Sequence, residues 1–600
     1  MPKLQTFFSN RKVFGILLGI IILLRFLFPE ADAPLLKLTP DLSDEGWWAA
    51  SALSKLKTGT WLLNGKSAGF VLAPLYNAIL YIWLSLFGVG GLQLRLMHIL
   101  VGCGSIAAFH SFVKQTWPPK AEIATLLFAA NFFLFTFGRL GFPENIQIAL
   151  LLWHFALLPK VFSISQNSLV HTFWTGFILG LAFLIKVSFL AIIPAIAVVW
   201  LMLSFRNGFN FQKLGLLCSG IFIPIGLWIV AIYLPLRSSF QLQADWMNLV
   251  FANPNQAISI ARLYNWLMHF IQVPFLLHPS NFLLVILAAL SLIQTGNLFS
   301  LSVWKEMPLG LAIALSFFWA CFVLMLFSDG SERRLVFLLP MLSVIAAGSA
   351  FSSETRQPYP VAFLLLVLFF LLGNIFHFIM NHSPFYWKIS GALLMLLPFF
   401  IYSKTELSFK FLLNRTMLAA FYVWIGCYTL SVSLWLGFEW YVGFAAVPIL
   451  VLAIAWINKH PHHSQYLLAT LIGLNLFLMI NFLSQPNFSN KIVSTKAAKV
   501  LGTSKVAGPN IIFGFMPYGN HIPLYHSDIA PGYEKFYQPN LAIANFYVDA
   551  YPVSKQNYDP LPLLSEIYQM GRTTQEVFRD TVYKRFGGKA EVVVIYDLGK

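Results

Sequence analysis

The chain has 600 residues, of which 58% are hydrophobic and only 10% are charged, and its mean hydropathy is +0.72. About a quarter of the residues in an ordinary soluble protein are charged, so this composition excludes a cytosolic enzyme, a disordered protein and a fibrous repeat. The formal net charge of +16 comes without a basic run interleaved with aromatic residues, so it does not indicate nucleic-acid binding. The remaining class is a polytopic membrane protein, whose spans need about 20 apolar residues each.

Charge is concentrated at the C-terminal end of the chain. Residues 485–600 contain 12 Lys+Arg and 9 Asp+Glu, whereas the first 484 residues contain the other 27 and 14. The sequence therefore predicts a transmembrane domain over residues 1–484 and a soluble domain over residues 485–600. A segment of about 110 residues is long enough to bury a hydrophobic core.

The N-terminal segment predicts how the chain enters the membrane. Lys3, Arg11 and Lys12 precede an apolar run over residues 13–28, and no small-residue cleavage site follows this run. Basic residues favour the cytoplasmic ends of spans, and a secretory signal would end in a cleavage site. We therefore expect an uncleaved first helix, a cytoplasmic N-terminus and an outer loop over residues 29–70.

The segment Val71–Gly88 decides the topology of the helices that follow it. If it spans the bilayer, the basic loop Lys114–Lys120 lies outside; if it does not, that loop lies inside and the loop around Glu144 lies outside. The positive-inside bias favours the second arrangement, so we expect a short helix that dips into the outer leaflet. The later loops then alternate between the two sides of the membrane, which gives about 15 crossings. The last helix, Leu467–Phe482, places the C-terminal domain on the outer side.

The soluble C-terminal domain is predicted to be a small α/β or α+β domain. Strands are expected at Ile511–Met516 and Ala590–Tyr596, because both runs are short and apolar. Helices are expected at Leu561–Met570 and Thr574–Phe586, where the spacing of apolar residues is helical. The four cysteines of the chain all lie in apolar runs and show neither a disulfide framework nor a metal-binding spacing.

Two groups of carboxylates are expected on the outer side of the membrane. Asp44 and Glu45 stand beside Trp47, and a carboxylate held at the membrane face by aromatic residues can act as general base on an acceptor hydroxyl. The alternative is an acidic pair solvated in a loop. Glu144 follows Pro143 at the outer end of a helix, where it is either a second carboxylate facing Asp44 or an acid stabilised by the helix dipole.

Cations are expected on the same side. Lys186 lies in the middle of the apolar stretch Phe173–Leu203, which is long enough for two crossings with Lys186 at the turn. It either binds an anionic lipid phosphate or extends to the interface as an anchor. Arg333 and Arg334 can bind a phosphate bidentately or serve as ordinary loop charges. His269, in a long outer loop, is a candidate substrate contact.

Outer carboxylates and outer cations together suit the transfer of a sugar from a lipid phosphate. The carboxylate takes the proton of the acceptor, and the cations stabilise the phosphate as it leaves, where charge develops. A donor linked to a lipid also explains why the site lies at the bilayer.

The motifs resemble those of the GT-C glycosyltransferases, in the style of protein O-mannosyltransferases and lipid A aminoarabinose transferases. Asp44-Glu45-Gly46-Trp47 resembles the first Asp-Glu motif of that class. Further motifs follow in the order of the class: Ala73-Pro74-Leu75-Tyr76, Gly88 through Arg95-Leu96, Gly138-Arg139-Leu140-Gly141-Phe142-Pro143-Glu144, Gly176 through Lys186, and Arg334 through Pro340. The resemblance covers roughly residues 10–350 and implies a mainly α, polytopic transmembrane bundle with a small α/β extracytoplasmic domain.

The resemblance also implies roles for individual residues. Asp44 would be the catalytic base, assisted by Glu144, with Glu45 as the other catalytic candidate. The donor phosphate would be held by Lys186, Arg333 and Arg334. The candidate substrate contacts are Arg95, Arg139, Trp47, Tyr76 and His269.

The sequence departs from the pattern of the class at three points. Ala73 stands where the class often has proline after a basic residue, and Glu144 stands where the aminoarabinose transferases have aspartate. The chain contains no Trp-Trp-Asp-Tyr-Gly motif, which argues against an oligosaccharyltransferase.

The resulting hypothesis is a membrane glycosyltransferase that moves a monosaccharide from a polyprenyl-phosphate donor to a lipid, glycan or protein acceptor on the outer face of the membrane. The alternative is a lipid-phosphate transporter or flippase without catalytic activity, which would be expected to show repeated halves with broken helices. No cofactor is predicted, and a divalent metal is left open without support from the sequence. The expected partners are the donor, the acceptor and membrane lipids, with no nucleic acid, and the expected location is a bacterial inner membrane.

Overall fold

The computed structural model describes most of the N-terminal half of the chain and most of its C-terminal domain. The described residues are 10–33, 42–62, 68–162, 168–241, isolated positions between 281 and 295, 301–326, 336–348, 463–508, 511–525, 534–552, 567–583 and 590–599. Many of the expected crossings fall at residues 349–462, outside this part, so the number of crossings stays a prediction.

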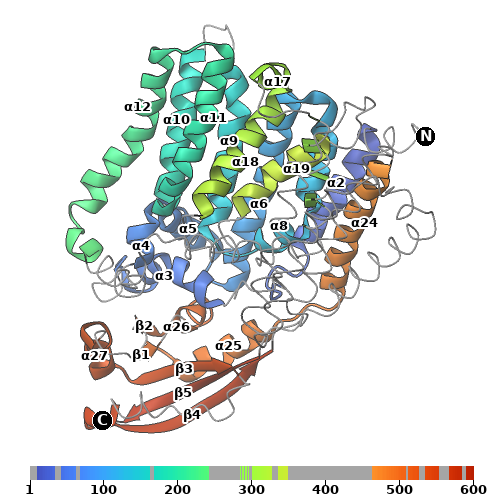
Figure 1. Cartoon of the computed structure of the whole chain (residues 1–600). Coiled ribbons are helices and arrows are strands. Elements are labelled where there is room, and N and C mark those ends of the chain that lie inside the picture. The colour runs from blue at the N-terminus through green and yellow to red at the C-terminus, as the bar shows by residue number, and fades with distance from the viewer. Residues whose placement is uncertain are drawn as a thin grey trace, which may run out of the picture.

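The described residues up to Ser484 form a helical bundle, and the C-terminal domain lies across one end of it (Figure 1). The helices of this part are α2 (Arg11–Phe26), α3 (Leu42–Thr58), α4 (Ala68–Leu72), α5 (Pro74–Phe87), α6 (Gly91–Thr116), η1 (Pro118–Lys120), α7 (Ala121–Ala130), α8 (Phe132–Phe137), α9 (Pro143–Val161), α10 (Ser168–Ile185), η2 (Val187–Ile192), α11 (Ile193–Asn207), α12 (Phe211–Trp228), η3 (Ile229–Tyr233), α17 (Leu301–Glu306), α18 (Leu309–Leu326), α19 (Leu338–Gly348) and α24 (His463–Ser484).

Five helices in the described residues are long and apolar enough to cross a membrane. They are Gly91–Thr116 (α6), Ser168–Ile185 (α10), Val187–Asn207 (η2 with α11), Phe211–Tyr233 (α12 with η3) and Leu468–Leu501, which begins in α24 and runs on into the C-terminal domain. The chain is therefore an integral membrane protein. Helix α5 has 14 residues, which corresponds to about 21 Å, less than the roughly 30 Å of a hydrocarbon core.

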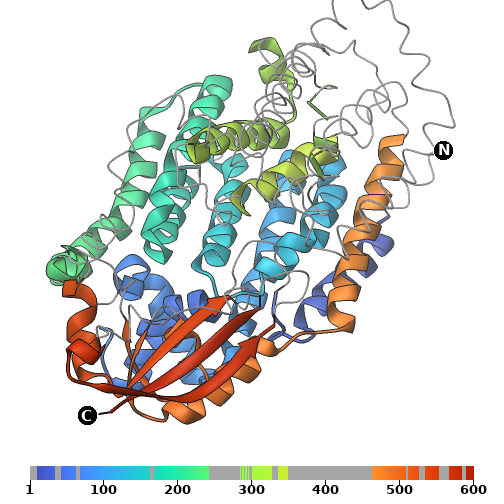
Figure 2. The ribbon, with the colours of Figure 1, turned by 60° about the horizontal axis from the view of Figure 1, so that its bottom comes forward.

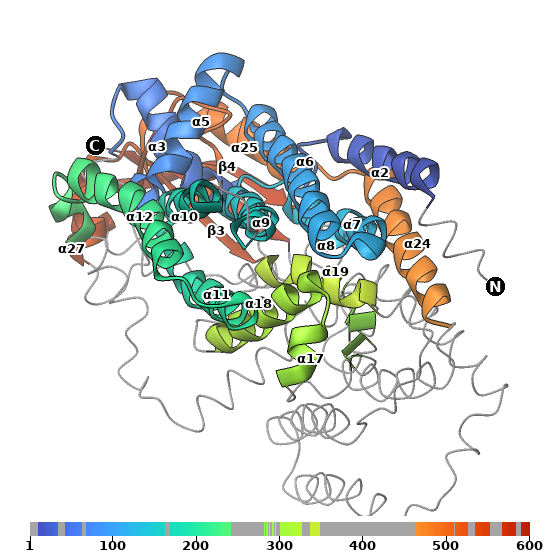
Figure 3. The same cartoon turned by 90° about the horizontal axis from the view of Figure 1, so that it is seen from above.

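Seen along the bundle, the helices fall into two groups (Figure 3). Helices α10, α11 and α12 stand on one side, α2, α7, α8 and α24 stand on the other, and α6 and α9 lie between them. Close approach within the first group depends on glycine: a Cβ at Gly176 of α10 would collide with the backbone of Leu217, and one at Gly220 of α12 would collide with the backbone of Phe173. Small residues at such positions let transmembrane helices pack backbone to backbone.

Two local signals place the elements that carry the predicted site. Pro143 begins α9, where a missing backbone donor does no harm. Helix α10 ends at Ile185, Lys186 is extended with φ −159° and ψ 121°, and η2 and α11 follow. The expected break at Lys186 between two apolar helices is thus confirmed.

In its described residues, the C-terminal domain has a five-stranded mixed sheet together with helices. Its elements are α25 (Ser489–Leu501), β1 (Lys505–Gly508), α26 (Ile511–Gly514), β2 (Ile522–Tyr525), α27 (Glu534–Ile543), β3 (Phe546–Pro552), β4 (Thr573–Val582) and β5 (Glu591–Gly599). The strand order is β2-β1-β3-β5-β4; β1 is parallel to β2 and β3, and β5 is antiparallel to β3 and β4. Figure 2 shows the sheet covering the end of the bundle at which α3 and α4 lie.

Some expected elements of this domain are correct and others are wrong. The strand expected at Ala590–Tyr596 is β5, and the predicted fold class, a helical bundle with a small α/β domain, is confirmed. The strand expected at Ile511–Met516 is instead the short helix α26, because a short apolar run does not distinguish the two structures. The helix expected at Thr574–Phe586 is instead β4, an edge strand paired with β5.

Helix α3 was not expected from the sequence, which indicated a polar outer loop there. It spans Leu42–Thr58 and carries the Asp-Glu motif in its first turn. Its later turns are lined with buried alanines and Leu53, which pack into the main core of the protein.

Candidate functional site

The first turn of α3 is fixed by a buried ion pair between Glu45 and Arg95. Arg95 lies on α6, and its Nη2 and Nε donate to Glu45 Oε2 and Oε1 at 2.6 and 3.1 Å. The backbone N–H of Gly141, in the turn before α9, also donates to Glu45 Oε1, at 2.6 Å. Glu45 has no exposed surface, so its carboxylate joins α3, α6 and the α8–α9 turn.

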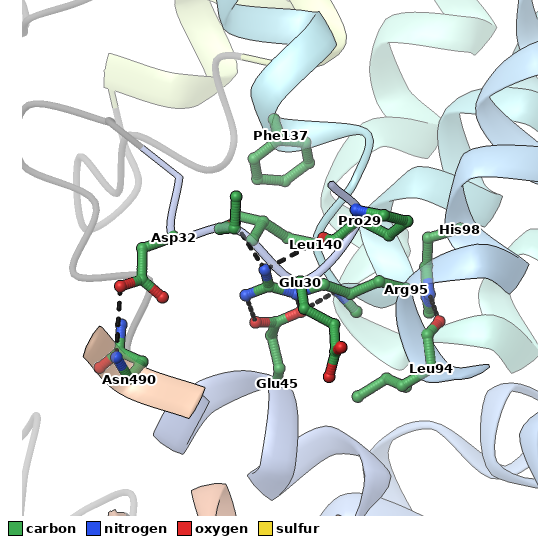
Figure 4. Close-up of polar contacts among 12 residues, drawn as sticks. Pro29, Glu30, Asp32, Glu45, Leu94, Arg95, His98, Phe137, Leu140 and Asn490 are labelled. Carbon is green, nitrogen blue, oxygen red and sulfur yellow. Dashed lines mark hydrogen bonds and ion pairs between the residues drawn. The ribbon is translucent and has the colours of Figure 1, made fainter. Parts of the chain in front are cut away.

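Arg95 extends the same network to the segment after α2. Its Nη1 donates to the carbonyls of Pro29 and Ala31 at 3.3 and 2.8 Å. Figure 4 shows the guanidinium group between the Glu45 carboxylate and this segment. All three guanidinium nitrogens of Arg95 and both oxygens of Glu45 thus make contacts within the protein, which fits a role in holding these elements together.

Asp44 precedes Glu45 in the first turn of α3. Its backbone is helical, and its side chain lies outside the described residues. Its role as base stays a prediction.

A second ion pair joins Lys186 and Glu144. Lys186 stands at the break after α10, and its ammonium donates to Oε1 of Glu144, in the first turn of α9. The other carboxylate oxygen, Oε2, is buried without a hydrogen-bond partner. The Lys186 ammonium also lies 4.2 Å from the centre of the Trp48 ring of α3, a cation–π contact. This cluster brings together α3, α9 and the α10–η2 break.

The backbone at Lys186 is held from α9 as well. Gln147 lies one turn after Glu144, and its amide donates to the carbonyls of Ala182 and Lys186 at 3.0 and 2.8 Å. Both carbonyls also accept backbone hydrogen bonds, from the N–H groups of Lys186 and Phe189, so the Gln147 amide adds a second bond to each and ties α9 to the break. Trp47 packs edge-on against Trp48, with ring centroids 4.4 Å apart.

Tyr76 and Arg139, both predicted substrate contacts, form hydrogen bonds to backbone carbonyls, and their contact with substrate stays a prediction. The fully buried Tyr76 hydroxyl donates to the carbonyl of Gly141 at 2.7 Å. Arg139 donates to the carbonyls of Leu27, at 2.7 Å, and Phe28, and its guanidinium lies 5.3 Å from the centre of the Phe135 ring. Among the described residues no carboxylate pairs with Arg139.

The sequence analysis missed residues that hold α3 in place. Asn77 of α5 is buried; its Oδ1 accepts from the N–H of Ala52 of α3 at 3.1 Å, and its Nδ2 donates to the carbonyls of Gly69 and Ala73. An asparagine inside an apolar helix is a signal that could have identified it, because such a group needs partners. Gln147 is a similar case.

Three predicted site residues fall outside the described part of the chain. They are Arg333, Arg334 and His269. Within the described part, no group of three or more His, Cys, Asp or Glu side chains is placed to hold a metal ion.

Comparisons with known proteins agree with the predicted resemblance. Among solved structures, ArnT from Cupriavidus metallidurans bound to undecaprenyl phosphate has a similar fold, with a TM-score of 0.50 and 13% identity over 97% of both chains. The apo state of the same protein gives 0.50 and 13% over 98% of both chains. The arabinofuranosyltransferase AftD from Mycobacteria aligns at 13% identity and a TM-score of 0.42, over 98% of this chain and 40% of AftD.

Sequence comparison points to the same class. No protein of curated function matches the chain in sequence. A family model does match: residues 71–232, the segment that contains Arg95, Glu144 and Lys186, match the family described as dolichyl-phosphate-mannose-protein mannosyltransferase. The expected resemblance to GT-C membrane glycosyltransferases, in fold and in this segment, is thereby confirmed.

Proposed function

We propose that the chain is a membrane glycosyltransferase that transfers a monosaccharide from a polyprenyl-phosphate-linked donor to an acceptor on the outer face of the membrane. The observation that carries this proposal is the Lys186–Glu144 ion pair against Trp48, next to the first turn of α3. An ammonium at the end of membrane helices, held by one exchangeable carboxylate, suits an anionic lipid headgroup. The family match includes both members of the pair.

Lys186 is proposed to hold the donor phosphate. When the donor binds, its phosphate replaces Glu144 at the ammonium, and Trp48 keeps the ammonium in place. As the bond between the sugar and the phosphate oxygen breaks, negative charge grows on the leaving polyprenyl phosphate, where a fixed cation stabilises it most. Arg333 and Arg334 are proposed as further ligands of this phosphate.

Asp44 is proposed to accept the proton of the acceptor hydroxyl. The hydroxyl oxygen forms the new bond to the anomeric carbon while its proton moves to the carboxylate. Glu144, released from Lys186, assists by orienting the acceptor. Glu45, Arg95, Tyr76 and Arg139 hold the surrounding turns in position, while Trp47 and His269 are proposed to contact the sugar or the acceptor.

The fold similarity to ArnT and the family match support transfer rather than lipid transport without chemistry. The structure of ArnT with undecaprenyl phosphate also supports a polyprenyl-phosphate donor for this chain. The acceptor is proposed to be a lipid, a glycan or a protein of the cell envelope. We further propose a bacterial inner membrane location, with the N-terminus in the cytoplasm and the C-terminal domain outside.

The proposal can be tested in two steps. Mass spectrometry of lipids, glycans and envelope proteins from a deletion strain should reveal an acceptor that lacks one sugar. The purified full-length protein should then release polyprenyl phosphate from a radiolabelled polyprenyl-phosphate sugar only when that acceptor is present. Movement of the labelled donor across proteoliposomes without release of polyprenyl phosphate would instead support the flippase alternative.

A further inference from the structure

Helix α3 lies between the membrane bundle and the C-terminal domain. Toward the bundle it is held by Glu45 and by Asn77 of α5. On its other side it meets α26, the short helix of the C-terminal domain (Figure 1). At Gly46, one residue after Glu45, a Cβ atom would lie under 3.0 Å from the carbonyl group of Phe513. Only a glycine permits this approach.

Lys57 makes a second contact with the C-terminal domain, at the far end of α3. Its ammonium donates to the carbonyls of Met516, at 2.5 Å, and of Gly519. Gly46 and Lys57 are three turns apart, a separation of about 16 Å along the helix. Two contacts so far apart fix both the position and the tilt of α3 against the domain.

The same domain also holds the segment after α2. Lys491 of α25 pairs with Glu30 at 2.5 Å, and the N–H of Asp32 donates to the carbonyl of Asn487 at 2.8 Å. The N–H of Asn490 donates to the Asp32 carboxylate at 3.2 Å (Figure 4). Arg95 binds the carbonyls of this segment and the Glu45 carboxylate. The contacts therefore form a closed ring: C-terminal domain, residues 29–32, Arg95, Glu45, α3, and back to the domain.

We propose that the C-terminal domain is a brace that sets the position of α3, and that Lys57 is the positioning residue through which it acts; this rests on the proposed function. Most of the stability of a helix in a protein comes from tertiary packing, so α3, with 17 residues, depends on its neighbours for a single position. Its first turn carries Asp44. A displacement of about 1 Å at a reacting group lowers turnover by about a hundred-fold, so a brace of this kind controls the rate.

The matched pair of Lys55 and Lys57 gives a sharp test. Both lie on α3. Lys55 donates to the carbonyl of Gly59, just after the helix, and lies 6.0 Å from the centre of the Trp61 ring; none of its contacts among the described residues reaches the C-terminal domain. In the full-length protein we expect Lys57→Met to lower kcat by about ten- to a hundred-fold, with binding of unlabelled polyprenyl phosphate unchanged. Lys55→Met should leave both unchanged. Lys57→Arg, which keeps donors for the two carbonyls, should restore most of kcat.

Hydrogen–deuterium exchange of the backbone amides in residues 42–58 provides a readout that needs no turnover. Exchange should be faster in Lys57→Met than in the wild type and Lys55→Met, because the brace is released. Gly46→Ala should have the same effect through the contact with Phe513. Gly473→Ala in α24, where a Cβ would meet nothing within 4 Å, is its control.

Two results would overturn the proposal. One is a Lys57→Met protein with wild-type kcat, and the other is exchange over residues 42–58 that does not change in Lys57→Met. If the wild-type protein transfers no sugar from any donor tried, the proposed function fails, and the exchange measurement alone then decides whether the domain braces α3.

Discussion

Lys186 and Glu144 form an ion pair between the break after α10 and the first turn of α9, with the Lys186 ammonium 4.2 Å from the centre of the Trp48 ring. Three elements of the bundle meet at this pair. The Lys186 side chain keeps 15% of its surface exposed and that of Glu144 7%, so an anion can reach the ammonium, where it competes with the Glu144 carboxylate.

Replacing Lys186 by methionine should weaken donor binding. Loss of a charge-assisted hydrogen bond to phosphate is worth roughly 1.5–3 kcal/mol, about ten- to a hundred-fold in affinity. Binding of polyprenyl phosphate to the purified protein measures this directly. Lys160→Met, at the exposed opposite end of α9, is the matched control. Wild-type affinity in Lys186→Met would leave this lysine as an interface anchor.

Replacing Glu144 by glutamine should affect a different quantity. The change removes the carboxylate that competes with phosphate for Lys186, so donor affinity should stay the same or increase. Turnover should fall, because the carboxylate proposed to orient the acceptor is lost; misplacing a reacting group by about 1 Å costs about a hundred-fold. The measurement is kcat and the donor KM for the same preparation. A loss of donor affinity equal to that of Lys186→Met would show that Glu144 does not act separately from Lys186.

Asp44 and Glu45 should differ in what their amide variants lose. Asp44→Asn is expected to reduce transfer by at least about a hundred-fold while leaving the melting temperature unchanged. Glu45→Gln leaves the buried Arg95 charge without its partner, which costs about 3–5 kcal/mol of stability. Its main effect should be a lower melting temperature and yield. The double variant Glu45→Gln, Arg95→Gln should recover part of that loss, because no charge is then left buried alone.

The sugar-transfer activity per folded molecule of each variant decides which of the two carboxylates is catalytic. Normal activity in Asp44→Asn together with an inactive but well-folded Glu45→Gln would reverse the assignment within the pair. Activity in both would remove the catalytic role of this turn.

The sequence predicted the features that depend on local signals. The break at Lys186 was predictable because a charge interrupts an apolar stretch long enough for two helices, and the start of α9 because Pro143 marks it. Glu45 and Arg95 are 50 positions apart in the chain, and nothing in either local pattern indicates that they pair. For the same reason, the sequence could not show that Glu45 is the buried partner of Arg95.

The outer helix α3 and the strand β4 were missed for another reason. Helix α3 has polar and charged residues at both ends and is stabilised through contacts with α5, α6 and α26, which no local pattern shows. Strand β4 alternates weakly because it is an edge strand with much of its length exposed, and its pairing with β5 decides its structure.

The short length of α5 leads to a prediction about topology. Because 14 residues span about 21 Å, we expect Lys114, at the end of α6, to face the cytoplasm. A cysteine at position 114, in a variant without the native cysteines, should not react with an impermeant maleimide in intact cells. A cysteine at Lys496, exposed on the C-terminal domain, should react. Labelling at position 114 from outside would show that the segment before it crosses the membrane.

Asp32 predicts a dependence of stability on pH. Burial raises the pKa of its carboxyl to about 6 from 3.8, Arg95 and Asn490 oppose this increase, and Glu45 adds to it. In the unfolded chain the group ionises near its ordinary pKa, so the folded state holds the proton more tightly than the unfolded state does. The stability contributed by the protonated form is complete below about pH 4 and is lost as the pH rises through about 6.

Asp32→Asn should therefore raise the melting temperature of the full-length protein in detergent. The increase of the pKa from 3.8 to about 6 corresponds to at most about 3 kcal/mol, so the gain over the wild type should be clear at about pH 7.5 and small at about pH 4.5. The amide oxygen can still accept the hydrogen bond from Asn490. Asp580→Asn is the control: Lys496 pairs with that carboxylate at 2.7 Å and lowers its pKa, so its removal should give no gain at either pH. An equal gain for Asp32→Asn at both pH values would contradict this prediction. The carboxyl of Asp32 is largely protonated at about pH 4.5 in the folded protein, so a gain there would not come from removal of a buried charge.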